Sequence, residues 1–388
     1  MLSLRLLFLR ILKLGATAYG GPAMIGQIKE MAVNRYGWIK EAEFMRGVAL
    51  CQLIPGATMV QIVTYIGYRV RGILGALTAS VAFVLPAFIA LLILSAVYFK
   101  FQTIWFIEAL FKGLGAIVVA IILNACINFG RSVLQDWKAI LIAVLSFFAF
   151  FFQWNFVLVF VLAAVAGLLL QPKRPPSKGP AAGGSPSGVQ EHDFLIIALL
   201  AAFLCMAAAL SYLVDPKLLD LFLSLSKIGA LAFGGGWTAL PLIQYEMVDR
   251  LHWLSTKEFL DGIALGQVTP GPILITATFV GYKVLTFLGA FMATLGVFFP
   301  SFFILVLLIP YHDRLKGVEK VRMMEQGVLG SFIGMLALVL FNFGKTSLVD
   351  LPRILMASAA FIALYKKVSL PYILLAGGVL SLLIYGIG

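Results

Sequence analysis

The stretch that decides the fold reads Gly266-Gln267-Val268-Thr269-Pro270-Gly271-Pro272, and apolar residues flank it at 259–265 and 273–282. Pro270 and Pro272 lack a backbone N–H and restrict the residue before them, so a continuous helix cannot run through the stretch. The pattern predicts two half-helices of about three turns each that meet at a bend. At membrane depth, such a break is tolerated only where it is buried in protein or lines a wet cavity.

The composition places this break in a membrane. The chain of 388 residues is 62% hydrophobic and 12% charged, with a mean hydropathy of +1.03, which predicts an all-α polytopic integral membrane protein. The net charge of +12 comes from basic residues at segment ends and in short loops, so it indicates inward-facing loops and not nucleic-acid binding. The three cysteines lack CxxC spacing, and neither a disulfide framework, a metal site nor a cofactor is expected.

The stretch around Pro270 has a counterpart near residue 55. Cys51-Gln52-Leu53-Ile54-Pro55-Gly56 aligns with it at an offset of 215, so that Gln52 matches Gln267 and Pro55 matches Pro270. Elsewhere the offset is 214. Matches at this offset are Lys13-Leu14-Gly15 with Lys227-Ile228-Gly229, Tyr19-Gly20-Gly21 with Phe233-Gly234-Gly235, Gly67-Tyr68 with Gly281-Tyr282, Pro86 with Pro300, and Asn128-Phe129-Gly130 with Asn342-Phe343-Gly344. The chain therefore consists of two copies of one unit.

The expected organisation is a first repeat over 1–170, a flexible cytoplasmic linker over 171–193, a linking membrane helix over 194–214, and a second repeat over 215–388. Residues 171–193 are rich in Pro, Gly, Ser and Lys, which is typical of a linker in water. Six segments in each repeat plus the linking helix give about 13 membrane segments. One extra crossing between two even blocks predicts that the second repeat is inverted.

The distribution of Lys and Arg supports the inversion. If every segment crosses and the N-terminus is cytoplasmic, 18 basic residues lie inside and 9 outside; without a crossing at 194–214 the counts become 14 and 13. The sequence therefore predicts a cytoplasmic N-terminus and linker and an external C-terminus. If the first two segments of each repeat are re-entrant instead, the linker and the C-terminus lie on the same sides as before. Charge does not separate these two cases.

Broken helices of inverted repeats predict a substrate site near the membrane midplane. Half-helix N-termini present free N–H groups and a positive dipole end, which suit an anion. Neutral donors close to the breaks are expected to add hydrogen bonds without the cost of a buried charge. Kinks that ease helix packing, and amides that hold helices together, are the structural alternatives. The candidate substrate-binding residues are Gly20, Gly21, Gln52, Pro55, Gly56, Gln61, Gly234, Gly235, Gly236, Gln267, Thr269, Pro270 and Gly271.

Charged residues close to the breaks are further candidates. Lys13 and Lys227 occupy equivalent positions about two turns before a glycine break, and an intramembrane lysine indicates function unless it snorkels to water. Lys227 lies mid-segment, so it is expected to contribute more to anion binding than Lys13. Proton coupling would need a carboxylate near the site, and Glu30, Glu246, Glu258 and Asp261 are available. Ser255 and Glu258 fit a capping box that starts the first half-helix.

The Gly-Gly-Pro and Gly-Gly-Gly breaks, Gln52–Pro55–Gly56, Gly266–Pro272 and Gly281-Tyr282 resemble the repeated motif of the chromate ion transporter (CHR) family in its long two-domain form. The resemblance covers nearly the whole chain except the linker. It implies efflux of chromate across the bacterial cytoplasmic membrane. Ala57 departs from the pattern, because the second copy has Pro272 there, and equal roles for the two copies do not follow.

The leading hypothesis is a secondary transporter that exports chromate by alternating access, driven by a coupling proton or an exchanged anion, since no ATP-binding motif occurs. The alternatives are a transporter of sulfate, thiosulfate or another oxyanion, and a passive anion channel. A membrane enzyme fits poorly, because the breaks hold Gly, Pro, Gln and Thr instead of clustered catalytic side chains. Besides the oxyanion, membrane lipid is the expected partner, and the sequence does not fix an oligomeric state.

Overall fold

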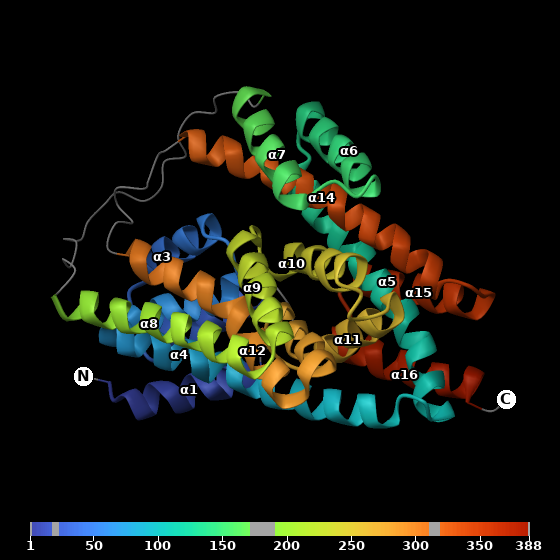
Figure 1. Cartoon of the computed structure of the whole chain (residues 1–388), viewed down its shortest axis with the longest axis horizontal. Coiled ribbons are helices and arrows are strands. Elements are labelled where there is room, and N and C mark those ends of the chain that lie inside the picture. Colours follow the sequence, from blue (N-terminus) through green and yellow to red (C-terminus); the bar gives the residue numbers. More distant parts are fainter. Residues whose placement is uncertain (1, 18–22, 171–190, 310–318, 387–388) are drawn as a thin grey trace. The chain divides into compact units, whose positions relative to one another are not determined.

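The computed structural model describes residues 2–17, 23–170, 191–309 and 319–386, and these are helical with no strand among them (Figure 1). The first repeat comprises α1 (Leu4–Thr17), α2 (Ala23–Lys29), the π-helix η1 (Glu30–Arg35), α3 (Glu41–Leu53), α4 (Thr58–Phe101), α5 (Trp105–Val133), α6 (Trp137–Phe151) and α7 (Phe156–Leu170). The predicted linker 171–193 lies mostly outside the described residues. The helix expected at 194–214 is α8 (Glu191–Val214).

The second repeat has the same order of elements. It comprises α9 (Pro216–Leu231), α10 (Gly236–Gln244), the π-helix η2 (Tyr245–Arg250), α11 (Thr256–Val268), the 3₁₀ turn η3 (Ile273–Ile275), α12 (Thr276–Leu308), α14 (Glu319–Ser347), α15 (Leu351–Tyr365) and α16 (Leu370–Tyr385). Both predicted proline breaks are present, between α3 and α4 and between α11 and η3, and the Gly234–Gly236 break separates α9 from α10; the Gly20–Pro22 break lies outside the described residues. The capping box also forms, since Glu258 accepts hydrogen bonds from the N–H and the hydroxyl of Ser255 at 2.9 and 3.0 Å.

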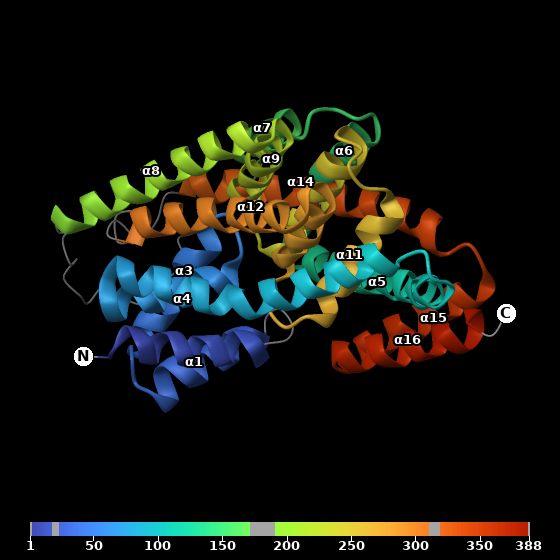
Figure 2. The ribbon, with the colours of Figure 1, turned by 60° about the horizontal axis from the view of Figure 1, so that its bottom comes forward.

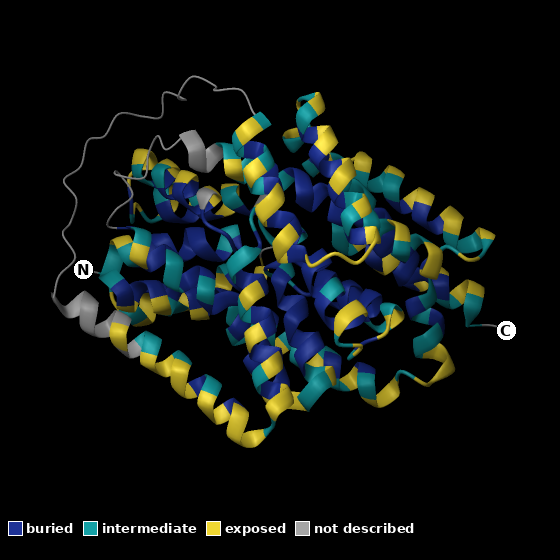
Figure 3. Ribbon diagram, turned by 45° about the horizontal axis from the view of Figure 1, so that its top comes forward, coloured by how far each residue is buried: buried dark blue, intermediate teal, exposed yellow. Residues whose placement is uncertain are grey.

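Among the described residues, four helices are long and apolar enough to cross a membrane: α4, α5, the η3–α12 segment and the part of α14 from Met323 to Ser347. Large apolar side chains stand exposed on the outer faces of other helices, as on α8, where Figure 3 shows exposed residues in yellow. Such surfaces are expected where lipid is the solvent. The chain is therefore a multi-pass membrane protein, as its composition predicts.

Long helices α4 and α12 each contain a sharp bend at the same place in the repeat. The bend of α4 lies at Arg71–Gly72 and that of α12 at Leu285–Thr286. Beside each bend two glycines bring the arms into contact, because a Cβ at Gly67 or at Gly281 would overlap the carbonyl of Gly75 or of Gly289. Each long helix is thus two packed arms, matching the separate segments expected at 44–68 and 73–98 and at 256–283 and 285–310.

The second bend carries backbone strain that the first avoids. Thr286 has φ 47° and ψ −131°, whereas Gly72 at the equivalent position has φ 60° and ψ −152°. A β-branched residue in this region costs about 1–3 kcal/mol. Thr286→Gly is therefore expected to stabilise the protein by about 1 kcal/mol after the entropy of glycine is subtracted.

Thermal inactivation in detergent measures this effect as a later loss of the monodisperse peak in size-exclusion chromatography. Gly72→Ala is the matched control. A Cβ at Gly72 would meet no atom within 4 Å, so its expected destabilisation reports the backbone conformation alone. A Thr286→Gly variant no more stable than the parent would contradict the assignment of strain.

Two compact units make up the chain, and each takes parts of both repeats, although α11 lies in the second unit while its counterpart α3 lies in the first. The first unit contains Met1–Ala96, Lys178–Glu246 and Thr269–Lys316; the second contains Val97–Ser177, Met247–Val268 and Gly317–Gly388. In the first unit α9 packs on α12, and in the second α14 packs on α6 and α7 while α5 packs on α15 and α16 (Figures 1 and 2). The boundaries expected between the repeats are sequence boundaries, and the repeats interleave within each unit.

Within the first unit the repeats are related by a twofold axis between α4 and α12. A groove of about 220 Å³ is lined by six residues of each helix, and all twelve form equivalent pairs at the offset of 214. The pairs are Leu77 with Phe291, Ser80 with Thr294, Val81 with Leu295, Val84 with Phe298, Leu85 with Phe299, and Phe88 with Phe302. Packing against these helices is repeated too, since Gly15 abuts the Phe83 carbonyl as Gly229 abuts the Val297 carbonyl.

Contacts at the first break favour a re-entrant hairpin over two crossings. Arg69 donates to the Glu43 carboxylate, and Gly47 lies against the Tyr65 ring, so α3 and the first arm of α4 run antiparallel. The 13 residues of α3 span about 20 Å, less than the hydrocarbon core of about 30 Å. In the second unit, Lys257 Nζ lies 3.7 Å from Glu108 Oε1, which puts the starts of α11 and α5 at one membrane surface.

If the first two segments of each repeat are re-entrant, the excess of Lys and Arg on the inner side increases. Re-entrance moves four basic residues of the first repeat inside and two of the second outside, so the bias rises from 18 against 9 to 20 against 7. The residues that move are Lys29, Arg35, Lys40 and Arg46, and then Arg250 and Lys257. The predicted sides of the linker and of the C-terminus are unchanged, while the number of crossings stays a prediction.

Candidate functional site

The two breaks have the same backbone geometry and exchange contacts across the twofold axis. Gly56 has φ 123° and Gly271 has φ 124°, a region that only glycine adopts without strain. Gly56 packs against Ser301 of the second repeat, and a Cβ at Gly271 would lie 2.7 Å from the Ala87 Cβ of the first. Ala87 and Ser301 are equivalent residues, each following the proline inside its helix. The contact is thus isologous, as a twofold axis requires.

Helix N-termini from both repeats meet at this place in the first unit. The Gly56 N–H donates to the Ala232 carbonyl at 2.9 Å, which ties the first break to the end of α9. A Cβ at Gly235, the N-cap of α10, would lie 3.6 Å from Thr58 Oγ1 at the start of α4. A Cβ at Gly236 would lie 2.7 Å from the Ile273 Cβ, where η3 begins. The N-termini of α4, α10 and the η3–α12 segment therefore converge.

The predicted donor side chains divide into three kinds of environment. Gln61 is buried and its Nε2 donates to the Pro55 carbonyl at 2.8 Å, so this amide supports the first break. Gln267 is buried, and among the described residues its Nε2 has no hydrogen-bond partner. Gln52, the equivalent residue, is exposed, and Thr269 is buried. Of the amides at the breaks, Gln267 alone combines burial with an open donor in the described part of the chain.

The remaining candidates are placed as follows. Gly234 has φ 85° and Gly235 has φ 98°, which gives α10 its start after a tight turn. Pro270 is half-buried. Lys13 and Lys227 are both exposed, on α1 and on α9, so burial does not distinguish them. Gly20 and Gly21 lie outside the described residues.

Sequence reasoning did not find the residues against which the breaks pack. Thr58, Ala87 and Ser301 carry no motif, and the contact between Gly56 and Ser301 joins distant parts of the chain. A signal was present in the matched prolines Pro86 and Pro300, because each break packs on the residue that follows such a proline. The paired π-helices, Glu30–Arg35 and Tyr245–Arg250, were also not expected.

Comparisons with known proteins agree with the repeat and with the site. The family model described as "Chromate transporter" matches twice, over residues 5–168 and 219–382, at the offset of 214 that the motifs show. An uncharacterized transporter of Methanocaldococcus jannaschii is 35% identical over 97% of this chain and 94% of its own. Chromate transport proteins of Cupriavidus metallidurans and Pseudomonas aeruginosa are 31% and 30% identical over 99% and 98% of this chain, and over 94% and 92% of theirs.

No solved structure matches the chain. The two matches of the family model cover most of both repeats, and the relatives align over nearly their full length. The chain therefore belongs to the chromate transporter family.

Proposed function

We propose that this chain is a secondary transporter that exports chromate by alternating access between its inverted repeats. The observation that carries the proposal is the convergence of the N-termini of α4, α10 and the η3–α12 segment around Gly56, Gly235 and Gly236. Each helix N-terminus acts as roughly half a positive charge. Three such ends repel one another unless an anion lies between them, so the arrangement suits a compact dianion.

The neutral donors near the breaks fit the same ligand. A tetrahedral oxyanion presents acceptor oxygens in every direction, and neutral donors such as backbone N–H groups and side-chain amides supply hydrogen bonds without a buried countercharge. These groups select for charge and size more than for the central atom. Chromate is proposed in preference to sulfate or thiosulfate because the relatives named by substrate are chromate transport proteins.

The membrane potential complicates the test of a pump for dianions. Moving one charge through 100 mV is worth about 2.3 kcal/mol, so an inside-negative potential draws a dianion outward even through a passive channel. Accumulation in everted vesicles therefore does not separate a transporter from a channel. Counterflow does, because only a carrier that exposes its site alternately exchanges labelled for unlabelled substrate.

The deciding experiment uses the purified protein in liposomes. Vesicles loaded with unlabelled chromate are expected to take up radiolabelled chromate transiently above equilibrium, at zero potential and without a pH gradient. Unlabelled sulfate in the bath is expected to compete weakly. No overshoot with fast equilibration would indicate a channel, and an overshoot abolished equally by sulfate or thiosulfate would assign a broader oxyanion carrier.

Inverted repeats also predict where the ends of the chain lie. Reporters fused after residue 180 and after residue 388 are expected on opposite sides of the membrane, the first cytoplasmic and the second external. The physical reason is the excess of Lys and Arg on the inner side, which re-entrance increases. Alkaline phosphatase and fluorescent-protein fusions report the two sides independently, and placement of both reporters on one side would rule out the inversion.

A further inference from the structure

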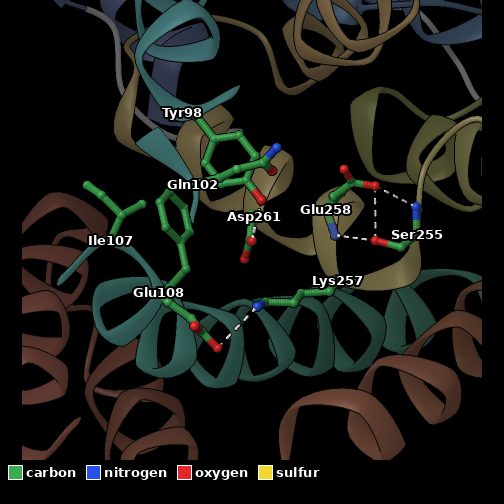
Figure 4. A pocket seen from close by; sticks show the side chains of 9 residues that line it. Tyr98, Gln102, Ile107, Glu108, Ser255, Lys257, Glu258 and Asp261 are labelled. Atoms are coloured by element: carbon green, nitrogen blue, oxygen red, sulfur yellow. Dashed lines mark hydrogen bonds and ion pairs between the residues drawn. The ribbon is translucent and has the colours of Figure 1, made fainter. Parts of the chain in front are cut away.

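A polar cavity lies within the second unit. Its volume is about 310 Å³, and the start of α11, the start of α5 and the end of α4 enclose it (Figure 4). Its lining residues are Tyr98, Gln102, Ile107, Glu108, Phe111, Ser255, Lys257, Glu258 and Asp261. All of them belong to the second unit.

Asp261 is the buried acid of this cavity. Its side chain accepts a hydrogen bond from the Tyr98 hydroxyl at 2.7 Å, and the residue is 3% exposed. Among the described residues the other buried carboxylate is Glu246, which accepts from Ser224 at 3.0 Å and does not line the cavity. A buried carboxylate in a membrane protein indicates a functional group by default. Asp261 also lines a cavity with polar walls, which Glu246 does not.

The other charged groups of the cavity have partners of their own. Lys257 faces Glu108 at 3.7 Å, and Glu108 also pairs with Lys112 on α5. Glu258 is held by the capping box with Ser255. Helices α14 and α16 also pack on α11, but the described lining includes no residue of either. Asp261 therefore faces a neutral phenol, and its protonated form is the less costly one to bury.

The repeats differ at this position in a way that fits transport in one direction. The equivalent of Asp261 in the first repeat is Arg46, although the neighbouring Glu258 is matched by Glu43. In the predicted topology the cavity of Asp261 opens outside, since it shares a surface with the start of α5. In this topology the second repeat has the acidic Asp261 on the external side, and the first repeat has the basic Arg46 at the equivalent position on the cytoplasmic side.

We propose that Asp261 is the proton-binding group that couples chromate export to proton entry, an inference that rests on the function proposed above. A proton from external water in the cavity binds a carboxylate oxygen of Asp261, while Tyr98 positions that carboxylate. The same proton leaves to the cytoplasmic side after the transporter changes state, and the carboxylate is restored. Asp261 and Gln267 lie six residues apart on α11, so this short helix holds the proton-binding carboxylate and ends at the Pro270 break.

The test separates coupling from chromate movement. Liposomes containing the protein are clamped at zero potential with valinomycin and equal potassium, and the lumen is made acidic. With one proton exchanged per chromate, a difference of one pH unit is expected to drive about tenfold accumulation, because each unit is worth 1.36 kcal/mol. Asp261→Asn is expected to lose this accumulation and to keep counterflow within about threefold of the parent.

Three further variants sharpen the result. Glu41→Gln changes an exposed carboxylate paired with Lys29 and is expected to leave accumulation unchanged. Tyr98→Phe is expected to keep coupling with a shifted pH profile, as a positioning residue should. Glu246→Gln tests the other buried carboxylate. A Glu246→Gln variant that loses pH-driven accumulation while Asp261→Asn keeps it would overturn the assignment.

An infrared readout does not depend on transport. The carboxyl C=O stretch of the parent is expected to titrate with pH, and this band should be missing in Asp261→Asn. Absence of chromate counterflow in the parent would reject the proposed function and leave this titration intact. Counterflow without pH-driven accumulation in the parent, or no titrating band from Asp261, would overturn the coupling role alone.

Discussion

Gly56→Ala is expected to lower the rate of chromate counterflow at least about a hundredfold at matched protein level. Residues other than glycine adopt a φ of 123° only with about 1–3 kcal/mol of strain, and the new methyl group would also overlap Ser301. About 2.7 kcal/mol of strain corresponds to a hundredfold. The loss should fall on transport more than on insertion, because the strain lies at the point where helix ends of both repeats meet.

Matched variants separate strain from local crowding. Gly344→Ala is the control, since a Cβ there would meet no atom within 4 Å, and it should transport like the parent. Ser301→Gly added to Gly56→Ala removes the overlap but keeps the unfavourable φ, so rescue should be partial. Gly271→Ala, whose Cβ would meet Ala87 at 2.7 Å, should show the same pattern with Ala87→Gly. Transport by Gly56→Ala close to that of the parent would refute the importance of this geometry.

The sequence was sufficient for features that depend on local chemistry. Pro55 and Pro270 place the breaks, because proline cannot continue a helix, and the spacing of Ser255 and Glu258 places the start of α11. The repeat could be predicted for the same reason: equal backbone geometry demands Gly and Pro at equal intervals. The offset of 214 recurs in the family matches and in the paired residues of the groove between α4 and α12.

Features that depend on long-range packing could not be predicted. Charge counting treats re-entrant and crossing segments alike, and the antiparallel contact of Glu43 with Arg69 is what favours re-entrance. Helix length held a usable signal, because 13 residues are too short for a hydrocarbon core. The hydrogen bond between Tyr98 and Asp261 spans 163 residues, so the sequence named Asp261 only as one of four available acids.

Gln267 and Gln52 are equivalent in the repeat but differ in their environments. They match in the repeat, yet Gln267 is buried with an open Nε2 among the described residues, and Gln52 is exposed. The neighbouring difference between Ala57 and Pro272 agrees with unequal roles. Burying an unsatisfied amide donor costs about 1–3 kcal/mol, which a site for an oxyanion recovers when the ligand binds.

Gln267→Met is therefore expected to weaken chromate affinity about 10- to 100-fold, and Gln52→Met less than about threefold. Hydrogen bonds to charged groups contribute about 1.5–3 kcal/mol, and each 1.4 kcal/mol is tenfold in affinity. The measurement is the chromate concentration giving half-maximal counterflow, with thermal inactivation of both variants as the control for folding. Methionine at this position buries no unsatisfied polar group, so Gln267→Met without ligand is expected to be at least as stable as the parent. Equal losses of affinity in the two variants would contradict the assignment and would make the two amides interchangeable ligands in the two states of the cycle.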